Sequence, residues 1–513
     1  MTDRIRLAAL ALFFSIIGVA TDTLAAEPAR PAACYNVRDY GATGDGKTLD
    51  TAAIQKAVDA SAAAGGGTVV LPAGTYLSGT ICLRSHVTLY LGPGAVLRGS
   101  RNIADYPSHT PQILYVYRPR FTKSLIYAER AEGIGLTGQG LIDGQGEFFP
   151  ARPGDDGGRP YILRFSECRN VEVRGLRFRN SARWLSHYLA CEDVVIDGIS
   201  IHAPIRANRD GIDVDSCRHV RIANCHIHSG DDAIVLKATA ARPCEHVTVT
   251  NCVLRSMASA LKLGTESNGG FADIAVSNCT IYDTGHSGIT LSMVDGGVCE
   301  RITVSNITMK NVASAICIRL GNRARPIPDL PPPGMGAMRD ISISNVQADG
   351  VGETGCSVTG IPGFPLKNVT LENIRLRFAG GGTLADFARP IPEKEDGYPS
   401  GRMFGILPAY GFFCRHVENL RLRGLDLSCE KPDDRPAFVL DDVRDLNLFD
   451  LRATASSSAP ALVVFKNVQG ALIHGCRPPG PLDTFLRLQG TTGDIALEAN
   501  SLTSVKHPLQ RDP

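Results

Sequence analysis

A segment of about 27 residues recurs along the middle of the chain, and this repeat limits the possible folds more than any other feature. One apolar position recurs at intervals of 26, 27, 27 and 28 residues: Val194, Val220, Val247, Ile274 and Ile302. The next interval, to Ile341, is 39 residues because the Pro-rich stretch 322–336 is inserted. Within each copy, apolar and polar residues alternate over a few positions, which indicates β-strands rather than helices.

A second short strand follows in each copy, for example GIDVD (211–215), AIVLK (233–237) and GITLS (288–292). Two or three short strands per copy, with no helical period, predict a solenoid whose coils stack about 4.8 Å apart. Because crossovers between parallel strands are right-handed, we expect an all-β, right-handed parallel β-helix.

The two ends of the chain differ from the repeats. Residues 35–100 are expected to form an N-terminal cap and the first coils, with a short helix at 51–63 that covers the open end of the solenoid. We expect a single β-helical domain over 35–495, with an insertion loop at 379–413 and a loose tail at 496–513.

The N-terminal residues have the layout of a secretory signal peptide. Arg4 and Arg6 precede the apolar run LAALALFFSIIGVA (7–20), and Thr23 and Ala25 supply small residues at a cleavage site. The pattern predicts a signal peptide over 1–26 and a secreted or periplasmic protein. An uncleaved anchor is the alternative, although the run is short for a membrane span.

The charges of the chain nearly cancel, since 53 Lys and Arg face 52 Asp and Glu for a net charge of +1. No global field therefore attracts nucleic acid or an anionic membrane, and no basic cluster is interleaved with aromatic residues. We expect a monomer that needs no cofactor and that binds neither nucleic acid nor, after signal removal, a membrane.

Two sets of repeated residues are predicted to be structural. Stacked amides at a turn can hydrogen-bond from coil to coil. Such a column contains Asp197, Asn224, Asn251, Asn278, Asn306, Asn345 and Asn373. Many of the fifteen Cys also recur at the repeat interval, as small buried residues do. Disulfides between neighbouring coils stay possible, but no Cys or His spacing predicts a metal site.

The stretch HSGDDAIVLK (228–237) places Asp231 and Asp232 side by side before a buried strand. Aligning NRDGI with GDDAI puts Asp210 one coil before Asp232. Three crowded carboxyl groups raise one another's pKa, so that one can hold a proton near neutral pH. Such a set suits the hydrolysis of a glycosidic bond with inversion, although a calcium site stays open.

The same register predicts what lies beside these acids. Asp213 stacks over Val235 and Lys262, while Asp215 stacks over Lys237 and, further along, Arg319. Because these positions alternate with buried ones, we expect the carboxylates and Lys237, Lys262 and Arg319 to share one outer groove. Nearby Lys and Arg suit an acidic sugar. Lys262 has a structural alternative, an ion pair with Asp213.

These motifs resemble glycoside hydrolase family 28, the polygalacturonase family, over roughly residues 35–475. The opening YNVRDYGATGDGKTLD (35–50) is similar to a stretch shared by pectin-cleaving β-helix enzymes. NRDGID resembles the family's Asn-Thr-Asp motif with Arg209 in place of Thr, and SGDDAI resembles its Asp-Asp motif. The resemblance implies that Asp231 is the general acid and that Asp210 and Asp232 hold and activate water.

Two motifs of the family are missing. Its Gly-His-Gly falls at 258–260, where this chain has Ala-Ser-Ala, and its Arg-Ile-Lys falls at 290–292, where this chain has Thr-Leu-Ser. The chain is therefore interpreted as a divergent member that acts on a different pectic bond or from a chain end. Candidate substitutes are Lys262, Glu266, His286, Asp295, Arg319 and Arg323.

Other residues are predicted to contact sugar from the margins of the site. His187, which follows the single Trp184, lies on the coil before Asp210 and is expected to line a subsite, with a structural role as the alternative. The insertions at 319–336 and 379–413 are expected to wall off one end of the groove. Tyr398, Arg402 and Tyr410 would then contact the substrate.

Two other functions compete with hydrolysis. A calcium-dependent polysaccharide lyase can use the same solenoid with a basic residue that abstracts a proton. A noncatalytic carbohydrate-binding β-helix is favoured by the missing motifs and disfavoured by the three acids.

Overall fold

The computed structural model describes residues 33–149, 158–205 and 208–512. The expected signal peptide, residues 1–26, lies outside the described residues. No helix in the described part of the chain is long and apolar enough to cross a membrane.

Strands dominate the chain, and their bounds fall into three groups. The first coils contain β1 (Cys34–Asn36), β2 (Asp45–Leu49), β3 (Gly67–Leu71), β4 (Gly74–Ser78), β5 (Ile81–Cys82), β6 (Val87–Leu91), β7 (Ala95–Gly99), β8 (Ser124–Glu129), β9 (Glu132–Gly138) and β10 (Leu141–Asp143). The middle coils contain β11 (Tyr161–Ser166), β12 (Arg169–Arg174), β13 (Arg177–Arg179), β14 (Ser186–Leu189), β15 (Glu192–Asp197), β16 (Ser200–Ala203), β17 (Ile212–Asp215), β18 (Arg218–Ala223), β19 (His226–Ser229), β20 (Ile234–Ala238), β21 (Cys244–Thr250), β22 (Val253–Ser256) and β23 (Leu261–Ser267). The last coils contain β24 (Phe271–Met293), β25 (Val298–Leu320), β26 (Ala337–Val351), β27 (Cys356–Thr359), β28 (Leu366–Phe378), β29 (Phe412–Cys429), β30 (Phe438–Phe449), β31 (Arg452–Ala453), β32 (Val463–Lys466), β33 (Gln469–His474), β34 (Leu482–Gln489), β35 (Gly493–Glu498) and β36 (Val505–Arg511).

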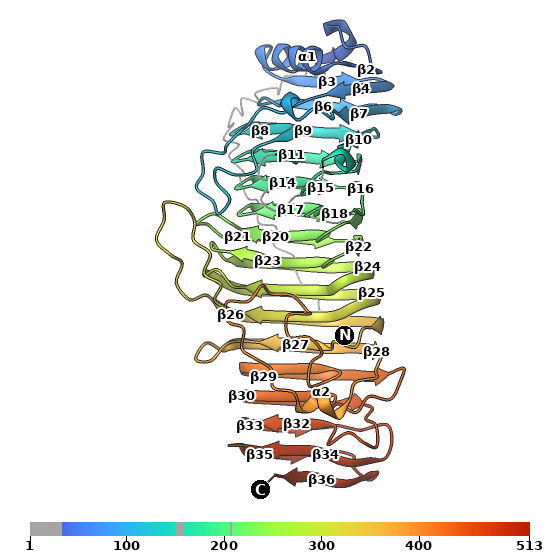
Figure 1. Ribbon diagram of the computed structural model, residues 1–513, viewed down its shortest axis with the longest axis vertical. Helices are drawn as coiled ribbons and strands as arrows, with labels where there is room; N and C mark the ends of the chain where they lie inside the picture. The colour runs from blue at the N-terminus through green and yellow to red at the C-terminus, as the bar shows by residue number, and fades with distance from the viewer. Residues whose placement is uncertain (1–32, 150–157, 206–207, 513) are drawn as a thin grey trace, which may run out of the picture. The chain divides into compact units, whose positions relative to one another are not determined.

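These strands stack coil upon coil as a parallel β-helix, which confirms the predicted fold class (Figure 1). In one column Ile212 lies over Ile234, which lies over Leu261 and then Ile289, and all four side chains point into the core. The period of two along each strand separates this inner column from the outer polar one.

The capping helix is also present. α1 (Thr51–Ala63) buries Ile54, Ala57 and Val58 against the first strands, so it covers the edge that the first coil would otherwise expose. A second helix, α2 (Leu384–Ala388), lies in the 379–413 insertion.

The two structural ladders form as predicted. Asn306 donates to Asn278 (3.1 Å), and Asn345 in turn donates to Asn306 (3.0 Å). The column is interrupted once, where Asn278 donates to Thr250 rather than to Asn251. All fifteen Cys belong to the described residues and none is in a disulfide.

The prediction that the solenoid ends at residue 495 and is followed by a loose tail is wrong. β36 pairs with β34, with Leu509 beside Leu486, so residues 505–511 form a further coil edge rather than a loose tail. The tail alternates weakly in polarity and contains Pro508, and these features hid the strand from sequence analysis.

Three long connections leave the coils and contact the outer face of β14, β17, β20 and β23, which carries the predicted acids. They are residues 100–123 before β8, 321–336 before β26 and 379–411 before β29. Figure 1 shows the first two as loops that extend from the same edge of the stacked strands.

Candidate active site

Four neighbouring strands, β14, β17, β20 and β23, present a polar outer face. His187 pairs in register with Asp213, Asp213 with Val235, and Val235 with Lys262. Asp215 pairs with Lys237, as the sequence predicts. Although these side chains point away from the core, they are buried, because the long connections cover this face.

Asp210, Asp231 and Asp232 come together where β17 and β20 begin. Gly211 N–H donates to the carbonyl of Asp232 (2.9 Å), which fixes the two turns in register. Asp210 and Asp232 are buried and Asp231 is partly exposed. Ser229 Oγ and Ser256 Oγ also donate to the Asp231 carbonyl (2.6 and 2.7 Å), so hydrogen bonds from two coils hold this turn.

Burial and mutual repulsion make Asp210 and Asp231 hard to ionise. Burial, followed by the charge of Asp232, raises the pKa of Asp231 above its usual range. Burial also raises the pKa of Asp210 well above that range, and the nearby charges of Asp213 and Asp231 add to the effect. A cluster of this kind can retain a proton at a pH where an exposed carboxyl has lost it.

Lys262 lies at the edge of the acid cluster. Its Nζ is 2.7 Å from Asp232 Oδ2, and the Ser259 N–H donates to Asp232 Oδ1 at 3.0 Å. Lys262 Nζ also donates to the hydroxyl of Tyr398 (3.2 Å), which the 379–413 insertion brings to the site. The alternative pairing of Lys262 with Asp213 is therefore wrong, because the two residues lie two coils apart.

Lys237 is shared by three carboxylates. Its Nζ lies 3.3 Å from Glu266, 3.7 Å from Asp213 and 4.0 Å from Asp210. Burial alone would lower the pKa of Lys237, but these acids raise it well above its usual value. Burial likewise opposes ionisation of Glu266, yet Lys237 and Arg323 hold the pKa of that carboxyl below its usual range.

Glu266 connects this network to the 321–336 loop. Arg325 Nη1 lies 3.4 Å from Glu266 Oε1 and 3.4 Å from the hydroxyl of Tyr117, which comes from the 100–123 connection. Arg323 pairs with Asp295 and lies 3.5 Å from Glu266. Tyr117 and Arg325 were not predicted, because neither connection follows the repeat that supplies register.

His187 is buried behind the acid cluster. Its Nε2 lies 3.0 Å from Asp215 Oδ2, and its ring stacks on Tyr161 with 5.6 Å between centroids. Burial lowers the pKa of His187 to about 4, so the ring is neutral at neutral pH. These contacts support the structural alternative for His187 rather than a place on an open subsite.

Arg319 lies on the outer face, as predicted, in register with Ser292, but its side chain does not reach the acids. Its guanidinium donates to the backbone carbonyls of Gly360 (2.9 Å) and Glu393 (2.6 Å), and it is buried. It anchors the 379–413 insertion, and burial lowers its pKa to about 10. The predicted contact of Arg319 with substrate is therefore wrong, because backbone carbonyls already hold its buried guanidinium.

Tyr410 and Arg402, the two other residues predicted to contact substrate from the insertion, differ from each other in burial. Tyr410 is fully buried, its ring packs on Phe378, and its hydroxyl donates to the carbonyl of Thr454 (2.6 Å). It belongs to the core, and its predicted contact with substrate is wrong because strand pairing resumes at Phe412. Arg402 is exposed and stays an untested candidate.

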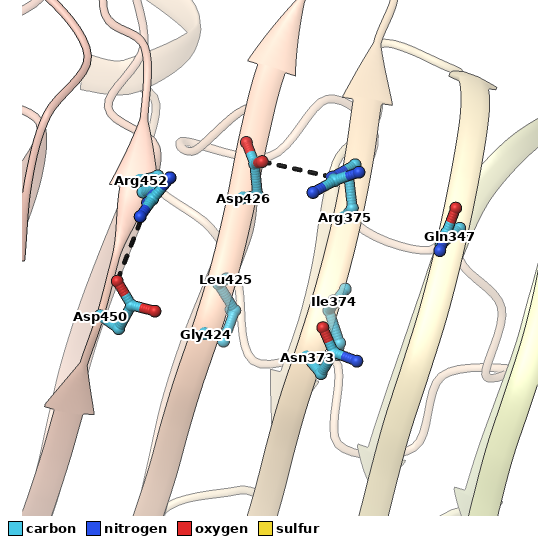
Figure 2. Close-up of a pocket in the computed structure, with 9 residues that line it drawn as sticks. All are labelled: Gln347, Asn373, Ile374, Arg375, Gly424, Leu425, Asp426, Asp450 and Arg452. Carbon is cyan, nitrogen blue, oxygen red and sulfur yellow. Dashed lines mark hydrogen bonds and ion pairs between the residues drawn. The ribbon is translucent and has the colours of Figure 1, made fainter.

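A surface pocket of about 200 Å³ lies elsewhere, on the outer face of β26, β28, β29 and β31 (Figure 2). Gln347, Arg375, Asp426 and Arg452 follow one another in register across it. Its charges pair within the pocket, as in Arg375 with Asp426 (3.2 Å). The pocket contains none of the acids predicted to act in catalysis.

Comparison with known proteins identifies the family of this β-helix. Residues 71–388 match the glycosyl hydrolases family 28, and the chain belongs to this family. Residues 34–101 also match the rhamnogalacturonase A/epimerase, pectate lyase-like family.

Individual relatives are similar over part of their length. A probable polygalacturonase of Vitis vinifera is 37% identical over 215 residues, which are 39% of this chain and 43% of the relative. An exo-poly-alpha-D-galacturonosidase of Dickeya chrysanthemi is 29% identical over 250 residues, 39% of this chain and 41% of the relative. The chain thus spans less than half the length of these curated relatives.

Solved structures share the fold. A family 28 exopolygalacturonase of Yersinia enterocolitica superposes with a TM-score of 0.66 at 21% identity, over 81% of this chain and 78% of that one. An exopolygalacturonase of Thermotoga maritima superposes with a TM-score of 0.60 at 23% identity, over 68% and 88% of the two chains. The fold is the right-handed parallel β-helix of polygalacturonases, which confirms the predicted hand.

Proposed function

We propose that this protein is an exported hydrolase that cleaves glycosidic bonds of pectic polysaccharide with inversion. The acid cluster of Asp210, Asp231 and Asp232 carries the proposal, since inverting glycosidases use one carboxylic acid and one carboxylate on opposite sides of the bond. Family membership supports the same chemistry, and the names of the relatives support a pectic substrate.

The environments of the acids support separate roles. Asp231 is the partly exposed member and its pKa is raised, so it is suited to donate a proton to the leaving glycosidic oxygen. Asp232 accepts hydrogen bonds from Lys262 and from Ser259 N–H, which stabilise negative charge on it. We assign Asp232, together with Asp210, to the water that attacks the sugar.

Action at a chain end is supported by the coil that precedes Asp210. There the rings of Trp184 and Tyr161 (centroids 6.1 Å apart) cover the outer face of the sheet, and both residues are buried. Tyr117 packs edge-on against Trp184 at 5.6 Å, and Lys237 Nζ lies 4.4 Å from the centre of the Trp184 ring. We infer that these packed rings obstruct a polysaccharide beyond Asp231, which favours cleavage near an end.

The central test replaces Asp231 with Asn. We expect kcat to fall by about 100-fold or more because the proton donor is lost, while the melting temperature stays near that of the wild type. Asp349→Asn, an exposed acid that pairs with Arg377, is the matched control and should keep full activity. Unchanged turnover in Asp231→Asn would exclude our assignment of the acid.

The products distinguish the competing functions. Polygalacturonate, rhamnogalacturonan and defined oligosaccharides should be assayed with product sizing and with NMR of the newly formed anomer. Inversion at the anomeric carbon and release of short products from one end are expected. An unsaturated, ultraviolet-absorbing product that requires calcium would identify a lyase, and binding of the oligosaccharides without any product would identify a noncatalytic protein. Sequencing of the N-terminus of exported protein tests the predicted signal peptide.

A further inference from the structure

Arg209 is a buried cation that forms no ion pair with any of the described residues, although the charge of Glu147 also acts on it. It is about 5% exposed, and its Nη2 donates to the carbonyl of Gly146 (2.8 Å). None of the described residues accepts a hydrogen bond from its Nε or Nη1. An unpaired buried charge is costly, so buried guanidinium groups are usually paired or bind a ligand.

The surroundings of Arg209 differ from those of three other buried cations in the described part of the chain. Lys237, Lys262 and Arg435 each form an ion pair with a buried carboxylate. Near Arg209, by contrast, a second cation, Arg159, donates to Asn208 Oδ1 (3.2 Å). Burial, followed by the charge of Arg159, lowers the pKa of Arg209. The charge of Arg159 thus acts on Arg209, which does not form an ion pair with any of the described residues.

Arg209 is also held directly beside the proposed general acid. Its carbonyl accepts hydrogen bonds from the N–H groups of Gly230 and Asp231, both at 3.1 Å. The N–H of Asn208 donates to Asp231 Oδ2 at 3.2 Å. A group bound by the Arg209 side chain would therefore lie near the bond that Asp231 protonates.

We propose that Arg209 binds the carboxylate of a uronic acid unit next to the cleaved bond. This inference rests on the proposed function and names the substrate class of the same site. A substrate carboxylate that enters among Asp210, Asp231 and Asp232 is repelled unless a cation receives it. Lys237 and Lys262 are already paired, whereas the free N–H groups of Arg209 fit the planar, two-oxygen geometry of a carboxylate.

The test compares acidic with neutral substrates. Arg209→Gln keeps a donor for the Gly146 carbonyl. It removes the positive charge and most of the N–H groups that would bind the two carboxylate oxygens. For an oligogalacturonate, kcat/KM should fall by about 10- to 100-fold, mainly through KM, since a charge-assisted hydrogen bond is lost. For the methyl-esterified oligosaccharide the same variant should lose less, so that the preference for the acidic over the esterified substrate falls. Arg209→Lys, which keeps the charge, should fall between Arg209→Gln and the wild type.

Binding without turnover separates this inference from the proposed function. Calorimetry with Asp231→Asn should detect the oligogalacturonate, with an affinity that falls as salt is raised. The double variant that also carries Arg209→Gln should bind it about 10-fold or more weakly. Equal affinities would overturn the role of Arg209 even if the enzyme cleaves pectin. A wild type that turns over no pectic substrate would instead overturn the proposed function, while the calorimetry would still test Arg209.

Discussion

Charged side chains form two kinds of ion pair on this β-helix, and the two differ in how far water reaches them. On the outer face of β17, β20 and β23, Lys237 and Glu266 form an ion pair whose side chains are only 5% and 6% exposed. On β24 and β25, Arg301 and Asp273 form an ion pair whose side chains are 50% and 34% exposed. The first pair is bound within an excess of carboxylates, whereas the second is open to solvent and has further partners in Glu300 and His246.

The exposed ion pairs follow from the stacking of the fold, whereas the buried acid cluster does not. Parallel stacking places like positions over one another, so an exposed column gains from alternating charge, as Asp273 and Arg301 do in successive coils. On the buried face Asp210, Asp213 and Asp231 lie close together, although burial and repulsion both oppose their ionisation. A stable solenoid does not need such a cluster, and its cost is consistent with a retained chemical role.

The largest effect is expected for Lys237→Met. The variant leaves Glu266, Asp213 and Asp210 without their shared cation, and breaking a buried pair in this way costs about 3–5 kcal/mol of unfolding free energy. Urea unfolding at neutral pH measures the loss. A change below about 1 kcal/mol would mean that water screens this face in solution, as it screens an exposed pair.

Asp213→Asn should change how stability depends on pH. Burial raises the pKa of Asp213 well above its usual range despite Lys237, so the folded state binds a proton that the unfolded state has lost. Stability contributed by this carboxyl is therefore present below the unfolded pKa of about 3.9 and is lost as pH rises toward the folded pKa. The variant should be stabilised relative to the wild type progressively as pH rises, by up to about 1.4 kcal/mol per pH unit.

Unfolding free energies of both proteins from pH 5 to 8 measure this difference. Subtracting the two curves cancels groups that respond in the opposite sense, such as His187, whose pKa is lowered to about 4 by burial. The remaining neighbours of Asp213 are Lys237, Asp232, Asp215 and Arg183. A difference that does not vary with pH would contradict the raised pKa of Asp213.

The repeat made the coil register predictable from sequence. Spacing alone aligned Asp213 with Lys262 through Val235, and Asp215 with Lys237, because a one-residue slip would turn every apolar side chain outward. The same register gathered Asp210 with Asp231 and Asp232. Hydrophobic periodicity therefore carried both the fold and the acids of the candidate site.

The connections between coils were not predictable in the same way. Tyr117 and Arg325 reach the site from segments without a period, so their contacts depend on loop conformation. Tyr398 was predicted near the substrate, but its hydrogen bond from Lys262 was not. The same lack of register placed Tyr410 at the substrate when it belongs to the core. The pairing of Lys262 with Asp232 depends on side-chain length and direction, which spacing does not specify.

A smaller effect is expected for Asn306→Ala, in the amide ladder. Asn306 donates to Asn278 and accepts from Asn345, and its φ of 56° lies in the left-handed region that Asn tolerates better than Ala. Losing the hydrogen bonds and the conformational preference should cost about 1–2 kcal/mol, measured by urea unfolding. Activity should be unchanged, since the ladder lies on a separate turn. A loss of activity at full stability would give the ladder a functional role that we do not assign to it.

The smallest effect is expected for Arg301→Gln, which completes the comparison with Lys237. Arg301 contacts both oxygens of Asp273 (2.7 and 2.9 Å), so its geometry is better than that of Lys237. Water screens the pair, however, and either partner is solvated when the other is removed. Thermal unfolding should therefore give a melting temperature within about 1 °C of the wild type, with no dependence on salt. A larger shift would mean that contact geometry, rather than burial, decides what an ion pair contributes on this fold.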